Sequence, residues 1–323
     1  MQQHKLKSRP MAYQIIQDNQ TPHTTKEIMM KVILATIPLL AVMAWLNPLW
    51  LIQPLVAAAA AYITEMLFEH FRSTTPKQDR FALKAPTDHS ALVTGVLLGI
   101  CLPPEAPLWI PVIGGIFSIA FGKQVYGGLG ANPFNPAMVA YVMLLLGFPT
   151  SMTDWSGLTG VIDGVSQATL LDRSQELSRS EWAQSPLFSQ TIALAIAALI
   201  GGLWLWQQKI IKARIPVAVI LGFVVMQWYL LEGSLVATLG LSLQDCLVGA
   251  VVFGAIFIAT DPVSAPQHPK SQILFGIGIG VLTAIIRDGQ QYPDGFAFAV
   301  LLMNIAGPSL DRIMNMKPRE PKA

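Results

Sequence analysis

The stretch MMKVILATIPLLAVMAWL, residues 29–46, contains Lys31 as its only charge and decides what kind of protein this is. An apolar run of this length satisfies its backbone hydrogen bonds in lipid only as a helix. Similar runs recur as far as Ala306. We therefore predict an all-α polytopic membrane protein with about ten transmembrane helices, over 29–46, 49–69, 89–102, 107–122, 134–149, 187–206, 213–231, 246–259, 272–287 and 295–312.

The composition agrees with this fold class. The chain has 323 residues, of which 53% are hydrophobic and 12% charged, and its mean hydropathy is +0.50. Soluble domains carry about 25% charged residues, so an ordinary cytosolic domain is excluded. Residues 1–28 contain charges and no apolar core, which argues against a cleavable signal peptide and predicts a cytoplasmic N-terminal segment.

The basic residues predict the orientation of the chain in the membrane. With the ten predicted helices, all 21 Lys and Arg residues fall on one side except Arg173, Arg179 and Arg287. Such a bias marks the cytoplasmic side, so we place both termini there and the 150–186 loop on the outer, periplasmic face. The basic residues are spread along one membrane face without interleaved aromatics, which argues against a nucleic-acid partner.

Two five-helix repeats, 29–149 and 187–312, are predicted on either side of that loop, with a cytoplasmic tail at 313–323. An odd number of helices makes the two repeats inverted relative to each other. In each repeat a short helix ends in a Pro-rich segment, and the Gly-rich helix that follows ends in Lys123 or Arg287. Interrupted helices at matching positions of inverted halves point to a central binding or ion site. Ordinary short helices with Pro-rich connections would give the same pattern.

Acidic residues inside the apolar runs are the candidates for an ion pathway. Glu65 lies on one face of the second helix with Glu69, and Asp261 lies at the end of the eighth. Buried acids are costly unless they have a function or a partner. Glu65 and Asp261 are therefore candidate pathway residues, although Glu65 pairing with a neighbouring helix is an equally simple role. Lys123 and Arg287 are candidate clamps for a phosphate or an acid, although an interfacial anchor explains Lys123 equally well.

The segment Asn132-Pro133-Phe134-Asn135-Pro136 precedes the fifth helix. Pro136 suits the first helical position and Asn135 suits the cap, where its side chain satisfies free amides. Asn132 and Asn135 are candidate ion or ligand contacts. No metal site is predicted, because the five histidines and the two cysteines lack metal-ligand spacing.

The outer loop contains Asp163-Gly164-Val165-Ser166-Gln167-Ala168-Thr169. Its Asp, Gly and Ser are ordinary turn formers, and a solvated connector would have a similar composition. However, the motif resembles the flavinylation site of the family formed by the D subunit of the Rnf (Rsx) electron transport complex and the B subunit of the sodium-pumping NADH:quinone oxidoreductase. This resemblance implies that Thr169 carries FMN through a phosphoester, with Asp163, Ser166 and Ala168 as its motif neighbours.

The resemblance extends over nearly the whole membrane region. It includes three further segments, Gln20–His23, Gly127–Ala137 and Thr260–Pro266, and the chain length favours the Rnf branch. It implies a flavin transferase that loads the FMN, companion subunits of the A, B, C, E and G types, a bacterial inner membrane and surrounding lipid. It also allows a second, noncovalent flavin.

The implied function is a membrane subunit of an ion-translocating oxidoreductase, in which covalent FMN relays electrons and electron flow is coupled to proton or sodium movement. The chain has no G-x-G-x-x-G motif after a strand, so electrons must come from partner subunits and no complete active site is expected here. A secondary transporter or channel subunit without a redox role is the alternative. Inverted halves would suit both, and only the Thr169 loop separates them.

Overall fold

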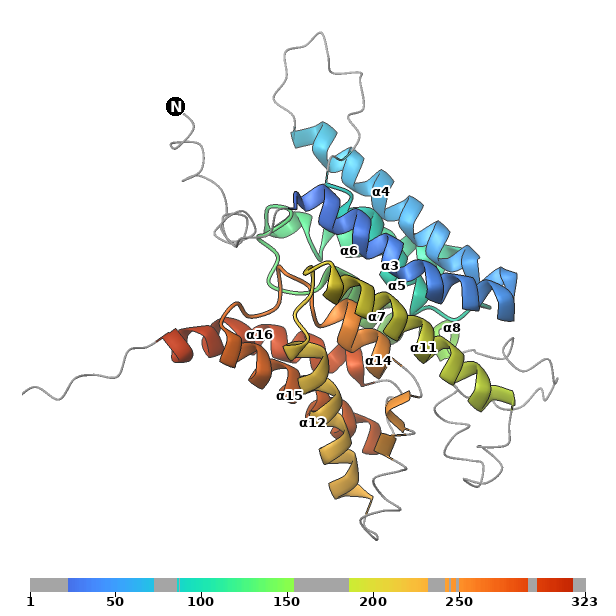
Figure 1. Ribbon diagram of the computed structural model, residues 1–323. Helices are drawn as coiled ribbons and strands as arrows, with labels where there is room; N and C mark the ends of the chain where they lie inside the picture. The colour runs from blue at the N-terminus through green and yellow to red at the C-terminus, as the bar shows by residue number, and fades with distance from the viewer. Residues whose placement is uncertain are drawn as a thin grey trace, which may run out of the picture.

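Helices form all the regular secondary structure in the described part of the computed structural model (Figure 1). The structure describes residues 23–72, 86, 88–153, 186–231, 242–243, 245–247, 250–289 and 295–315. The predicted all-α class is therefore confirmed for these residues.

Among the described residues, five helices are long and apolar enough to cross a membrane. Shorter helices lie between them, and three of these, α5, α7 and α12, are also apolar. This is the composition of a polytopic membrane protein, whereas ten crossings in two inverted halves remain a prediction. The five long helices are α3 (Thr25–Leu46), α4 (Ile52–Arg72, preceded by η1, Pro48–Leu51), α11 (Pro186–Gln207), α15 (Pro269–Asp288) and α16 (Phe296–Asn315); the shorter ones include α5 (Ser90–Ile100), α6 (Trp109–Ala120), α7 (Pro136–Gly147) and α12 (Arg214–Leu230).

The helix ends differ from the predicted ones where local capping decides them. α3 begins at Thr25 because the Thr24 side chain accepts from the Glu27 amide while the Glu27 carboxylate accepts from the Thr24 amide. The predicted eighth helix, 246–259, is not one regular helix: it contains the short α14 (Val251–Phe253) and a π-helical turn, η5 (Gly254–Ile258). A short helix, α8 (Pro149–Thr153), occupies the start of the predicted outer loop.

Glycines bring α5 and α6 against the backbone of α4. A Cβ atom on Gly95 would lie 2.6 Å from the carbonyl oxygen of Ala57, and one on Gly115 would lie 2.7 Å from the same oxygen. In the second half, a Cβ on Gly222 of α12 would lie 2.6 Å from the carbonyl oxygen of Ile277 of α15. Small residues at such crossings let membrane helices pack backbone to backbone.

The two halves meet along α3 and α11, which pack side by side. The Lys31 ammonium, near the start of α3, donates to the Gln208 side chain just after α11, at 2.9 Å. Gly201 of α11 contacts the backbone of Ala35 of α3. The start of α3 therefore lies beside the end of α11, so these two helices run antiparallel.

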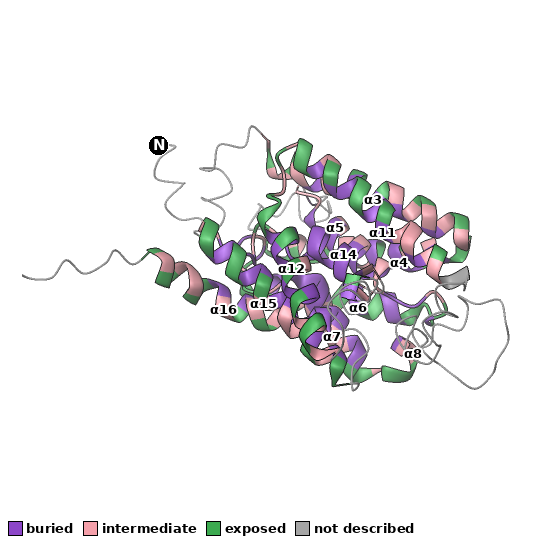
Figure 2. Ribbon diagram, turned by 60° about the horizontal axis from the view of Figure 1, so that its bottom comes forward, coloured by how far each residue is buried: buried purple, intermediate pink, exposed green. Residues whose placement is uncertain are grey.

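Figure 2 shows the buried residues gathered between the helices and exposed residues on the outer helix faces. Many of the exposed side chains are large and apolar, such as Trp45, Leu55, Val225 and Ile305. A continuous apolar exterior is unusual for a soluble monomer and suits contact with lipid.

Candidate functional site

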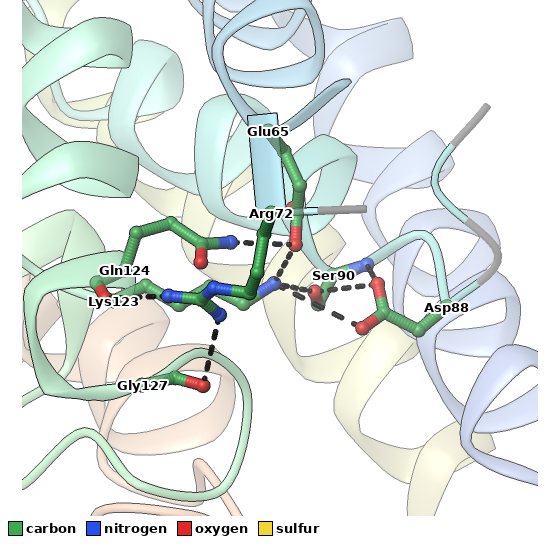
Figure 3. Close-up of polar contacts among 7 residues, drawn as sticks. All are labelled: Glu65, Arg72, Asp88, Ser90, Lys123, Gln124 and Gly127. Atoms are coloured by element: carbon green, nitrogen blue, oxygen red, sulfur yellow. Dashed lines mark hydrogen bonds and ion pairs between the residues drawn. The ribbon is translucent and has the colours of Figure 1, made fainter. Parts of the chain in front are cut away.

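A buried ion pair joins α4 to the segment after α6. The Lys123 ammonium donates to Glu65 Oε1 and to Ser90 Oγ (Figure 3). The side chains of Lys123 and Glu65 are each only 2% exposed. A lysine in the protein interior needs a counter-charge, since removing a charge from water costs several kcal/mol. The interfacial-anchor alternative for Lys123 is therefore wrong, and Glu65 does pair with a neighbouring element, as its simpler alternative predicted.

Asp88 and Ser90 extend this cluster toward the start of α5. Asp88 Oδ1 accepts from the Ser90 amide at 2.9 Å and from Ser90 Oγ at 2.7 Å, while Asp88 Oδ2 lies 3.9 Å from Lys123 Nζ. The Asp88 side chain is 22% exposed. Ser90 thus links the buried ammonium to a carboxylate that reaches the surface.

The turn after α6 closes the cluster from the other side. Gln124 donates to Glu65 Oε1 at 3.4 Å, and Arg72 of α4 donates to the carbonyl oxygens of Gln124 and Gly127 at 3.4 and 3.2 Å. Gly127 and Gly128 have φ values of +113° and +101°, which side-chain-bearing residues rarely adopt. These glycines allow the tight turn that presents its carbonyls to Arg72.

A cavity of about 200 Å³ lies beside this cluster, between elements of both halves. Its walls are largely apolar, with polar groups from loops at the helix ends. Three of the four predicted pathway residues, Asn132, Asn135 and Asp261, line it together with Lys123 and Ser90. Glu65 is not part of the lining and lies behind Lys123.

Asn135 caps α7 and ties the halves together. Its side-chain oxygen accepts from the amides of Ala137 and Met138 at 3.0 and 3.2 Å. Pro136 is the first helical residue, two residues after the predicted start at 134, but the Pro at the start and the Asn at the cap were both predicted. The backbone amide of Asn135 donates to the side-chain oxygen of Asn304 of α16 at 3.1 Å. The side-chain amide of Asn135 donates to the Ile258 carbonyl at 3.4 Å.

Asn132 and Asp261 differ in how far their polar atoms are satisfied. Asn132 Nδ2 donates to the Phe134 carbonyl at 2.9 Å, whereas its buried Oδ1 has no hydrogen-bond partner among the described residues. Asp261 accepts from the Val263 amide at 3.3 Å and from Ser264 Oγ at 2.7 Å. These hydrogen bonds stabilise the turn that contains Asp261. An unsatisfied buried oxygen at Asn132 leaves an acceptor for a ligand in the cavity.

Several residues of this region were not predicted from the sequence. Ser90 bonds to Lys123, Asn304 bonds to Asn135, and Asp88 lies 3.9 Å from Lys123, but all three lie far from these partners along the chain. Asn304 had a weak signal, because it is a lone amide in the apolar run of α16. The predicted flavin residues Thr169, Asp163, Ser166 and Ala168 lie outside the described residues.

Comparison with known proteins supplies the family. Residues 18–320 match the NQR2, RnfD, RnfE family. The chain is 40% identical over 314 residues to the D subunit of the ion-translocating oxidoreductase complex of Ectopseudomonas mendocina, covering 89% of both chains. It is 37% identical to the protein of that name from Erwinia tasmaniensis, covering 93% of this chain and 96% of the relative, and 39% identical to that of Yersinia pseudotuberculosis, covering 89% and 92%. The chain belongs to the NQR2, RnfD, RnfE family.

Proposed function

We propose that this chain is the D subunit of an ion-translocating oxidoreductase complex in a bacterial inner membrane. The observation that carries the proposal is the similarity to relatives of that name, which covers 89% of both this chain and the relative from Ectopseudomonas mendocina. The predicted membrane helices agree with it. The resemblance implies companion subunits of the A, B, C, E and G types. Such partners would supply the electrons, because this chain has no motif for a nicotinamide site.

The redox role rests on the sequence of the outer loop. Thr169 would hold FMN through a phosphoester, and the flavin would supply electron transfer while the protein supplies its position. Asp163, Ser166 and Ala168 form the rest of the acceptor motif. A flavin transferase must reach Thr169 before the cofactor docks, so the motif should be accessible from the periplasm.

Helix geometry supports a periplasmic position for this loop. α11 has 22 residues and is therefore about 33 Å long. Its end lies beside the start of α3, so Pro186, which follows the loop, lies about a membrane thickness away from the N-terminal end of α3. Basic residues gather at the N-terminal end of α3, which the positive-inside rule assigns to the cytoplasm.

Matching contacts in the two halves support the ten-helix inverted arrangement. α4 packs on α6 and α6 on α7, and in the second half α12 packs on α15 and α15 on α16. Both long crossings, α4 with α6 and α12 with α15, approach through glycines. Equivalent helices therefore make equivalent contacts.

The cavity is where we place the central site of this arrangement. Asn132, Asn135 and Asp261 would offer amide and carboxylate groups to a passing proton or sodium ion, with Glu65 behind Lys123. The apolar walls and the unsatisfied Asn132 oxygen also suit one edge of a second, noncovalent flavin. Such a flavin would be released by denaturation, whereas FMN on Thr169 would not.

The covalent flavin can be tested in membranes from cells that contain the transferase. On a denaturing gel under ultraviolet light, the wild-type chain should give a fluorescent band, and Thr169→Val should give none. Thr159→Val is the matched control, because it makes the same change in the same loop outside the acceptor motif and should keep the band. A dark wild-type band would sink the flavoprotein role and favour a transporter or channel subunit without redox function.

A further inference from the structure

The ion-pair cluster contains more acid than base. Glu65 and Asp88 share the ammonium of Lys123, and Glu69 lies one helical turn beyond Glu65 on the same face of α4. Arg72, a further cation on α4 in the described part of the chain, donates to backbone carbonyls. The neighbourhood therefore has room for one more positive charge.

One oxygen in the cluster also lacks a partner. Glu65 Oε1 accepts from Lys123 and Gln124, while Glu65 Oε2 is buried with no hydrogen-bond partner among the described residues. A carboxylate oxygen held away from water without a donor is unfavourable by about 1–3 kcal/mol or more. Such an atom points to a ligand that is bound there during part of the working cycle.

A proton fits this position better than a metal ion. Among the described residues, no group of three or more His, Cys, Asp or Glu side chains is arranged to hold a metal. Hard metal cations in proteins take several oxygen ligands, commonly six or more. A proton needs only the one oxygen that Glu65 leaves unsatisfied.

Lys123 is placed to exchange partners. Its ammonium already bonds to Ser90 Oγ, which donates to Asp88, and it lies 3.9 Å from Asp88 Oδ2. A lysine has a flexible stem and three donors, so it can move over such a distance without a backbone change. The helices around it are fixed, since Gly95 and Gly115 hold α5 and α6 against α4.

We infer that Glu65, Lys123, Ser90 and Asp88 form a proton-exchange site, in which a proton on Glu65 Oε2 replaces Lys123 as the partner of Glu65. The Glu65 carboxylate takes one proton from a hydronium ion of the aqueous phase, which becomes water, and Glu65 becomes a carboxylic acid. Lys123 keeps its protons and its charge, and shifts through Ser90 to Asp88. No electron is transferred at the site, and its net charge rises by one.

This inference rests on the proposed function and deepens it, because it names the proton as the cation taken up at the Glu65–Lys123 cluster. Among the residues that the structure describes, the charged and titratable groups around Glu65 come from three elements. They are Glu69 and Arg72 on α4, Asp88 and His89 before α5, and Lys123 after α6.

Infrared difference spectra of the intact complex, between about pH 8 and about pH 5, report carboxyl protonation directly. Wild type should gain the carbonyl band of a protonated, buried carboxyl in acid. Glu65→Gln should lose that band, and Glu69→Gln, the matched control one turn away, should keep it. A band that survives in Glu65→Gln would overturn the assignment.

Two further variants test the exchange of partners. Lys123→Met should show the band already at about pH 8, because Glu65 has lost its counter-ion, whereas Lys123→Arg should behave like wild type. Asp88→Asn, which keeps the hydrogen bonds at the start of α5 and should fold normally, should need stronger acid for the band. An unchanged onset in Asp88→Asn and Lys123→Met would contradict the exchange.

A last arm distinguishes the proton from sodium. Replacing potassium with sodium at constant pH should leave the band unchanged, and a band that sodium abolishes would overturn the choice of a proton. These spectra are independent of the fluorescent band of Thr169. A missing fluorescent band together with the expected infrared spectra would refute the flavin role alone. A fluorescent band together with infrared spectra that do not respond as expected would refute the exchange site alone.

Discussion

At the end of α4, the carboxylate of Glu65 meets the ammonium of Lys123, whereas at the end of α12 the amide of Gln227 donates to the carboxylate of Asp245 at 3.1 Å. Both sites lie where a Gly-rich helix, α6 or α15, brings a basic residue to its end. At the second site Arg287 donates to the Asp245 carbonyl at 3.2 Å, and its guanidinium lies 5.1 Å from the centre of the Phe223 ring.

The two sites have similar helix packing, of α4 with α6 and of α12 with α15, but they differ in their charged groups. In the first, two carboxylates share a lysine, and an uncharged serine connects them. In the second, the basic residue is an arginine that also uses an aromatic face, and an amide takes the place of the buried acid. In the proposed duplication, one site would hold an exchangeable charge and the other a fixed arrangement.

The largest difference between the two sites is expected when the buried acid Glu65 is removed. Glu65→Ala should lower the free energy of unfolding by about 3–5 kcal/mol, because it breaks a buried ion pair and leaves Lys123 with only the partly exposed Asp88 as counter-charge. Gln227→Ala should cost only about 1 kcal/mol, the value of one hydrogen bond. Denaturant unfolding in detergent, followed by tryptophan fluorescence, measures both.

A double variant gives the control for this experiment. Glu65→Ala combined with Lys123→Met should recover most of the lost free energy, since no unpaired charge remains. Equal losses in Glu65→Ala and Gln227→Ala would show that the two sites do not differ in the way described.

The glycine crossings should respond alike in the two halves. Gly115→Leu and Gly280→Leu should each destabilise the chain by about 3 kcal/mol, because a side chain there meets the backbone of α4 or α12. Thermal unfolding of the two variants should give similar shifts. Gly147→Ala is the control, since nothing lies within 4 Å of a Cβ at that position. A large effect in only one half would argue against a shared frame.

Introducing an acid into the second site should have a smaller effect than the glycine substitutions. Gln227→Glu replaces a donor to Asp245 with a second carboxylate, which should cost about 2 kcal/mol at neutral pH. In acid one carboxyl takes up a proton and donates to the other, so the loss should shrink as the pH falls. Unfolding free energies at about pH 8 and about pH 5 measure this change. A loss that is independent of pH would mean that the introduced side chain does not face Asp245.

The positions of the helices could be predicted from the sequence because apolar run length sets them. The cap of α7 was equally predictable, since Asn135 and Pro136 act within a few residues of themselves. The irregular α14 and η5 region was not, because its apolar residues have the composition of an ordinary helix.

The partners within the candidate site were harder to predict. Glu65 and Lys123 are 58 positions apart, and their contact depends on how α6 packs across α4. Both were recognised as unusual charges, but no local pattern joins them. Ser90 and Asp88 were not singled out in the sequence, and only the fold shows that they face Lys123. The Thr169 loop was identified by its motif alone and remains a prediction.

The π-helical turn at Gly254–Ile258 makes this part of the chain sensitive to insertions and deletions. A π-turn contains one residue more than an α-turn, so losing a single codon here would convert it into an α-turn and change which backbone groups are paired within the helix. The Ile258 carbonyl, which accepts from Asn135 of the other half, would then point elsewhere. We expect the family to tolerate apolar substitutions in this turn far better than a change in its length.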